Sequence, residues 1–150
     1  PGEASIVIMD EALEVMRRLR QVRPEDPESG GQLFGQFLGA DTVISEATPP
    51  TLLDRRSRYG FKPNRWLQKR EIRARHGRGL HFVGDWHTHP EACPSPSCDD
   101  IQSMSDCFRR SVHDLLVFVM IIVGTDPGPG GLYVALVDDQ GVRQLRYEPA

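Results

Sequence analysis

Two histidines and two aspartates lie close together near the middle of the sequence. His87 and His89 are one residue apart after an apolar run, and Asp99 and Asp100 follow a segment rich in Pro, Ser and Cys. If the apolar run is a strand, the two histidines project from the same face, and their imidazole nitrogens can both reach one ion. A carboxylate from Asp100 would complete three protein ligands and leave a fourth position open, as in hydrolytic zinc sites.

The segment around Asp100 also has a purely structural interpretation. Ser97 followed three residues later by Asp100 is a helix-capping pattern, and acidic residues in a first helical turn are favoured by the macrodipole. Capping and metal binding are compatible, because a capped helix fixes the direction in which Asp100 points.

Metal-assisted hydrolysis also needs a general base that is not a metal ligand. Glu28 lies in an acidic loop before GGQLFG and is the first candidate, although a solvated surface acid has the same appearance. Glu46, in VISEATPP, is a second upstream acid. The sequence thus offers two possible bases for one metal site.

The strands that would position these residues are indicated by β-branched runs, continuous apolar runs and turn residues. They are expected over residues 5–9, 32–38, 42–47, 80–86, 115–124, 132–138 and 142–148. The connection over 48–64 is expected to be irregular.

Three helices are expected between these strands. The first runs over 10–22 with Asp10 as its N-cap, and the second over 65–76 with Pro63 in its first turn and Gly77 closing it. The third runs over 98–110 and is capped by Ser97. This order predicts an α/β protein with one domain over residues 1–150, in which a mixed β-sheet is flanked by helices.

Composition limits the class of protein. The chain has 150 residues, 39% of them hydrophobic, a formal net charge of −3 and three cysteines. An odd number of cysteines argues against a disulfide framework and favours a reduced cytosolic protein. No apolar run has the length of a membrane span, and the N-terminus, which begins at Pro1, does not resemble a signal peptide.

Charge gives no reason to expect nucleic acid as a partner. The segment from Lys62 to Arg78 is strongly basic, which favours a solvated helix face, with an acidic partner as the alternative. The sequence leaves the oligomeric state open.

These motifs resemble the JAMM, or MPN+, metalloproteases, whose prokaryotic members are called JAB proteins. The family pattern is Glu-x-x-Gly-x-Leu-x-Gly upstream, then His-[Ser/Thr]-His-Pro, then Ser-x-x-Asp. Here ESGGQLFG begins at Glu28, HTHP covers 87–90, and SCDD covers 97–100 after the seven residues from Pro90 to Pro96. The two independent motifs occur in the family's order.

The resemblance implies a JAMM/MPN-type fold, similar to that of cytidine deaminases, and a role for each of five residues. His87, His89 and Asp100 would bind one zinc ion. Glu28 would take a proton from the attacking water and deliver it to the leaving amine. Ser97 would donate a hydrogen bond to the oxyanion.

The segments GDWHTHPE and DRRSRYGF resemble the small bacterial branch, which is encoded beside ubiquitin-like conjugation enzymes in anti-phage operons of the CBASS type. This implies a cytoplasmic zinc metallopeptidase or isopeptidase. Its substrate would be the bond after the extended C-terminal tail of a ubiquitin-like protein or a conjugated nucleotidyltransferase.

Three alternatives remain from the sequence. One is the trimming of sulfur-carrier proteins at their C-termini. Another is an inert structural zinc site in which Cys93 or Cys98 fills the fourth position. The third is a zinc deaminase, suggested by His-x-Glu at 89–91, but the cysteine spacing does not fit that class.

Overall fold

A computed structural model describes residues 4–111 and 113–149, so Pro1 lies outside the described residues. The helices are α1 (Asp10–Arg18), α2 (Arg65–His76) and α3 (Cys98–Arg110), with a short 3₁₀ turn at Pro129–Gly131. The strands are β1 (Ile6–Ile8), β2 (Gly30–Leu38), β3 (Asp41–Ala47), β4 (Arg55–Ser57), β5 (Gly60–Lys62), β6 (His81–Thr88), β7 (Phe118–Val123), β8 (Leu132–Asp138) and β9 (Gly141–Leu145).

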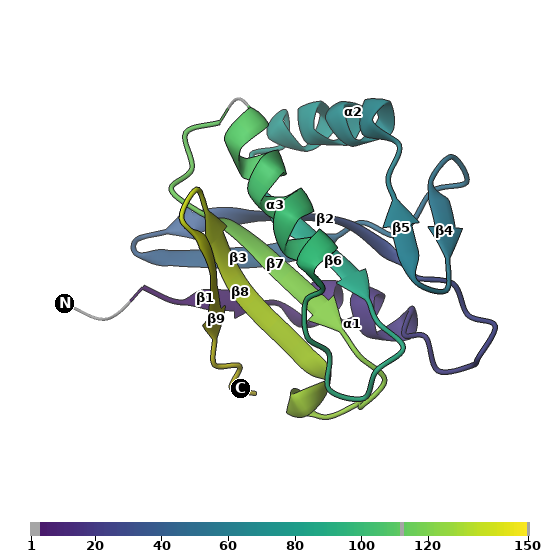
Figure 1. Ribbon diagram of the computed structural model, residues 1–150. Helices are drawn as coiled ribbons and strands as arrows, with labels where there is room; N and C mark the ends of the chain where they lie inside the picture. The colour runs from purple at the N-terminus through teal and green to yellow at the C-terminus, as the bar shows by residue number, and fades with distance from the viewer. Residues whose placement is uncertain (1–3, 112, 150) are drawn as a thin grey trace.

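Seven strands form one curled mixed sheet in the order β1-β3-β2-β6-β7-β8-β9 (Figure 1). The pairs β1–β3 and β6–β7 are parallel, and the other neighbours are antiparallel. The strands β4 and β5 form a separate hairpin. The α/β class, with one mixed sheet flanked by helices, is therefore confirmed.

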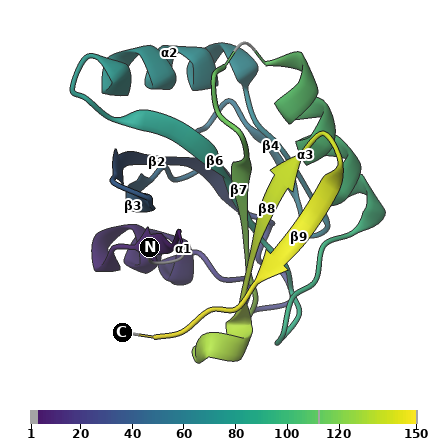
Figure 2. The same ribbon diagram turned by 90° about the vertical axis from the view of Figure 1, so that its left-hand side faces the viewer.

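Helices cover both faces of the sheet (Figure 2). Ala12 and Met16 of α1 pack against the face that carries Trp86, whereas Met104 of α3 packs against the face that carries Met120. All six residues of β7 are buried, because this strand lies between the two cores. Its continuous apolar run is thus explained by burial on both faces.

Strand β6 carries His87 near its C-terminal end, and His89 follows directly after the strand. Strand β6 pairs with β2 so that Gly30 lies opposite His87, which brings the segment before β2 close to the histidines. On its other side β6 packs closely on β7, since a Cβ atom at Gly84 would lie 1.8 Å from the Val119 carbonyl oxygen. Glycine is required here by the close approach of two backbones.

Some local expectations were wrong. Helix α1 ends at Arg18 rather than Val22, because the buried Gln21 side chain donates to the carbonyl oxygens of Asp26 and Arg58 and directs the chain away. The N-cap of α1 is Met9, so Asp10 is the first helical residue.

The second helix has the expected bounds, Arg65–His76, but Pro63 was expected in its first turn and is not there. Asn64 is its N-cap and accepts a hydrogen bond from the Leu67 amide at 3.1 Å, so Pro63 precedes the helix. Gly77 follows the last helical residue, but it has a right-handed φ of −62°. The expected irregular connection over 48–64 contains the β4–β5 hairpin. Helix α3 and strand β8 have the expected bounds.

No helix in the described part of the chain combines the length and apolar character needed to cross a membrane. The three cysteines are all free, with Cys93 and Cys98 exposed and Cys107 partly buried.

Candidate active site

Three candidate metal ligands meet at the C-terminal end of β6. The Nε2 atoms of His87 and His89 are 3.2 Å apart, and an Asp100 carboxylate oxygen lies 3.2 Å from the first and 3.1 Å from the second. The sequence placed these residues in one set, and the structure brings them into a nearly equilateral triangle of donor atoms.

This triangle has the dimensions that a tetrahedral zinc ion requires. Ligand atoms 2.0–2.1 Å from such an ion are about 3.3 Å from one another. Two imidazole nitrogens and a carboxylate oxygen are also ordinary zinc donors. The donor set and its spacing therefore fit a single zinc ion held by His87, His89 and Asp100.

Glu28 forms a second, looser grouping with the same histidines. One donor atom each from Glu28, His87 and His89 lies within 4.8 Å of the other two. The Asp100 oxygen is much closer to both imidazoles, so we take Asp100 as the third ligand and Glu28 as a neighbour of the site. No cysteine belongs to this grouping within the described residues.

Helix α3 fixes the position of Asp100. The Ser97 hydroxyl accepts a hydrogen bond from the Asp100 amide at 3.0 Å, and the Asp100 carboxylate accepts one from the Ser97 amide at 2.8 Å. This is a complete capping box, so the structural interpretation of Ser97 holds. The oxygen that accepts from Ser97 is also the one that faces both histidines, and capping therefore orients the ligand.

His89 has a hydrogen-bond partner on its second nitrogen. Its Nδ1 atom lies 2.9 Å from a Glu91 carboxylate oxygen. A proton on Nδ1 leaves the Nε2 lone pair free to bind a metal ion. Sequence reasoning noted Glu91 in a deaminase-like motif and interpreted it as a loop acid beside the cleft, but missed this role. The His-x-Glu spacing on an extended chain can signal it.

Two segments hold Glu28 beside the histidines. The β4–β5 hairpin binds its backbone, since the Glu28 amide donates to the Ser57 carbonyl at 2.7 Å and Arg56 Nε donates to the Glu28 carbonyl at 2.9 Å. Thr88, on the opposite face of β6 from the histidines, accepts a hydrogen bond from the next amide, Ser29, at 2.9 Å. The hairpin that sequence analysis missed thus positions the candidate base.

Burial governs the protonation of Glu28. Its residue is 6% exposed, and burial raises the pKa of its carboxyl although His87 and His89 act to lower that pKa. A raised pKa helps a general base to hold the proton that it has taken.

The pKa values of Asp100 and His89 move in opposite directions. Burial acts to raise the pKa of Asp100, but hydrogen bonds from His87 and His89 outweigh it and hold that pKa well below its usual range. Burial acts to lower the pKa of His89, but Asp100, Glu91 and Glu28 raise it above the ordinary value. The acid is therefore ionised over the physiological range and ready to bind a cation.

Glu46 does not share this environment. Its carboxylate forms an ion pair with Arg75 at 2.8 Å and a longer one with Arg78 at 3.4 Å. It lies on β3 and is absent from the pocket around His87. Glu28 is therefore the better candidate base of the two.

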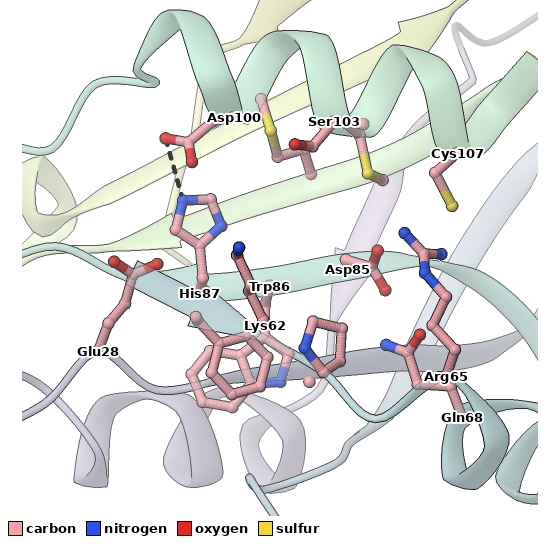
Figure 3. A pocket seen from close by; sticks show the side chains of 15 residues that line it. Glu28, Lys62, Arg65, Gln68, Asp85, Trp86, His87, Asp100, Ser103 and Cys107 are labelled. Carbon is pink, nitrogen blue, oxygen red and sulfur yellow. Dashed lines mark ion pairs between the residues drawn. The ribbon is translucent and has the colours of Figure 1, made fainter. Parts of the chain in front are cut away.

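A pocket of about 440 Å³ opens beside the candidate ligands. Figure 3 shows Glu28, His87 and Asp100 at one end, and Asp85, Arg65, Gln68 and Cys107 at the other. Burial raises the pKa of Asp85 to about 7, while His87 and Arg65 oppose that rise. Sequence analysis did not single out Asp85 or this second end of the pocket.

The fold and the site together define a JAB-type protein. Residues 10–135 match the family model described as prokaryotic homologs of the JAB domain, and the chain belongs to this family. The deaminase alternative is thereby excluded. A structural neighbour is the solution structure of protein DSY2949 from Desulfitobacterium hafniense, with a TM-score of 0.66 at 22% identity. The match covers 94% of this chain and 90% of that one, and it indicates a shared fold.

Several bacterial relatives carry names that describe an activity. The chain is 34% identical over 121 residues to a CD-NTase/cGAS isopeptidase of Enterobacter hormaechei, a match that covers 79% of this chain and 67% of the relative. It is 33% identical to a protein of the same name from Pseudomonas aeruginosa, and this match covers 86% of this chain and 80% of the relative. A probable metalloprotease of Sinorhizobium fredii is 33% identical over 92 residues, covering 58% and 56%. These names support assignment of the chain to a family of hydrolases.

Proposed function

We propose that this protein is a zinc-dependent isopeptidase of the bacterial cytoplasm. It hydrolyses the peptide or isopeptide bond that follows the extended C-terminal tail of a conjugated protein. The observation that carries this proposal is the triangle of His87, His89 and Asp100 beside a buried carboxylate, Glu28, that is outside the triangle.

The names of the relatives support the substrate class. Those named CD-NTase/cGAS isopeptidases support a nucleotidyltransferase as the protein that is released, within CBASS-type anti-phage defence. A ubiquitin-like protein with an extended tail is the second member of the same substrate class. No observation on this chain favours trimming of a sulfur carrier over deconjugation.

Each site residue has one task in the proposed reaction. His87, His89 and Asp100 would hold zinc, which supplies a water of pKa near 7 and polarises the scissile carbonyl. Glu28 takes a proton from the attacking water on its carboxylate and later delivers it to the leaving amine. Ser97, whose oxygen is already an acceptor for the Asp100 amide, keeps its O–H free to donate to the developing oxyanion.

The test is a cleavage assay on defined conjugates. The substrate is a CBASS nucleotidyltransferase joined through its C-terminal carboxyl to a lysine of a second protein, and mass spectrometry identifies the bond that is cut. The zinc-loaded protein should release the intact nucleotidyltransferase, and Glu28→Gln should retain one zinc while its rate falls by roughly 10²–10⁴-fold. Glu25→Gln, an exposed acid in the same loop, is the control and should cleave normally.

Two results would contradict the proposal. One is undiminished cleavage by Glu28→Gln, which would place the base elsewhere. The other is cleavage only of a sulfur-carrier precursor with residues beyond its C-terminal Gly-Gly, which would assign the trimming reaction instead.

A further inference from the structure

The end of the pocket remote from the candidate zinc ligands has chemistry of its own. Asp85 rises into it from β6, Arg65 and Gln68 reach it from α2, and Ser103 and Cys107 line it from α3 (Figure 3). None of these residues has a task in the proposed hydrolysis. A polar recess next to a reaction centre is the usual place for recognition of a substrate group.

Asp85 has an unsatisfied polar atom beside this recess. One of its carboxylate oxygens is shielded from solvent and accepts no hydrogen bond from the part of the chain that the structure describes. Shielding such an oxygen without a partner is costly. The Asp85 residue as a whole is only partly buried and lines the pocket, so its carboxylate presents an acceptor that a bound group can reach.

Arg65 supplies donors at the same end of the recess. It lines the pocket with Asp85, yet within the described residues no ion pair of 4.0 Å or shorter joins the two side chains. Donor and acceptor thus lie in one recess without satisfying each other. Gln68 adds a side-chain amide that can donate or accept a hydrogen bond.

Asp85 and Arg65 together determine which substrate group fits the recess. A substrate ammonium or guanidinium would pair with Asp85 but face Arg65, and a carboxylate would pair with Arg65 but face Asp85. A carboxamide carries both a donor and an acceptor without net charge, so it can satisfy both residues.

The recess lies about as far from the reaction centre as the side chain of a neighbouring substrate residue can reach. Asp85 and His87 are two positions apart on one strand and project from the same face, which separates them by about 7 Å. The side chain of a residue next to the scissile bond spans this distance.

We propose that Asp85 and Arg65 form a specificity subsite for a carboxamide side chain, Asn or Gln, next to the bond that is cut. This inference rests on the proposed isopeptidase function for its place in the reaction. The chemistry of the subsite is independent of that function, and two separate measurements can test them.

The first measurement is binding of small probes to the zinc-loaded full chain, followed by NMR on the Arg65 Nε–H and the Asp85 amide. Propionamide should shift both signals at lower concentration than methylguanidinium or methanesulfonate. Asp85→Ala should raise the propionamide concentration at the midpoint of these shifts by roughly tenfold. Asp85→Asn, which keeps an acceptor, should stay close to the wild type. Arg70→Ala, on an exposed part of α2 against Trp66, is the control and should bind normally.

The second measurement is cleavage of conjugates in which the residue on each side of the scissile bond is changed in turn to Gln, Leu, Lys or Glu. Wild type should favour Gln at one of these positions by roughly ten- to hundredfold in kcat/KM, chiefly through KM. Asp85→Ala and Arg65→Ala should each reduce this ratio, and Arg70→Ala should not.

The outcomes separate the two proposals. Equal midpoints for the three probes, an unchanged propionamide midpoint in Asp85→Ala, or cleavage without preference for Gln would overturn the subsite. Selective binding of propionamide together with no cleavage of any conjugate would retain the subsite and overturn the isopeptidase assignment.

Discussion

Glu91 offers a sharp test of how the candidate metal site is organised. The change Glu91→Gln removes the carboxylate that lies 2.9 Å from His89 Nδ1, while the side chain keeps its size. Loss of such an outer partner weakens metal binding by roughly 10–100-fold. The Glu91 side chain is 51% exposed, so water replaces part of the lost interaction, and we expect about a tenfold rise in the zinc Kd at pH 8.

The effect should become smaller in acid. Glu91 is one of the groups that raise the pKa of His89, so its neutralisation lowers that pKa and weakens competition between protons and zinc. Below the wild-type pKa of His89, the variant therefore recovers part of the affinity that it lost. Competition against a chelator of known affinity, from pH 5.5 to 8, measures both effects. An unchanged Kd at pH 8 would refute the role assigned to Glu91, and Glu25→Gln is the matched control.

Three further predictions concern stability and turnover. Ser97→Ala should lower the free energy of unfolding by about 1 kcal/mol and slow cleavage by roughly 10²–10³-fold; a normal rate would leave Ser97 as a cap alone. Gly84→Ala should lower the free energy of unfolding, measured in urea, by more than about 3 kcal/mol, because the new Cβ would meet a backbone oxygen of β7. Gly77→Ala should leave the free energy of unfolding nearly unchanged. In the zinc-free protein, ionised Asp100 stabilises the fold above pH 3.8, and this stabilisation is lost as the pH falls toward the lowered pKa of Asp100. Protonated His89 stabilises the fold below pH 6.5, and this stabilisation is lost as the pH rises through the raised pKa of His89. Urea unfolding in a chelator should therefore show the largest deficit of Asp100→Asn between about pH 4 and 6.5; a deficit independent of pH would contradict the pairing.

The sequence predicted the parts of the fold whose residues carry a strong local pattern. Helix α3 has the expected bounds because Ser97 and Asp100 cap it by themselves, through contacts three residues apart. Strand β7 was recognisable because burial on both faces demands a continuous apolar run.

Features that depend on distant contacts could not be predicted in the same way. The β4–β5 hairpin has strands of only three residues each, of which β4 is fully exposed, and it is tied to the chain through Arg56 and the Glu28 backbone. The early end of α1 depends on Gln21, whose partners lie as far away as Arg58.

The candidate site likewise combines residues that local patterns predict with residues that only tertiary packing brings together. Motif spacing was enough to collect His87, His89 and Asp100, because a strand and a capped helix position them locally. Glu28 was collected through the upstream family motif, although the distant β4–β5 hairpin holds its backbone. Asp85 carries no motif of its own, and its importance emerged only when α2 and α3 enclosed it in a pocket. Local patterns therefore predicted the candidate metal ligands, and tertiary packing was needed to find the recess beside them.

The most direct test of the account is a crystal structure of the zinc-loaded protein with anomalous diffraction data at the zinc edge. We predict one zinc ion bound by His87 Nε2, His89 Nε2 and an Asp100 carboxylate oxygen, with the Glu28 carboxylate near the remaining position but not bound to the metal. A thiolate of Cys93 or Cys98 in that position, or Glu28 as a ligand in place of Asp100, would contradict the assignment.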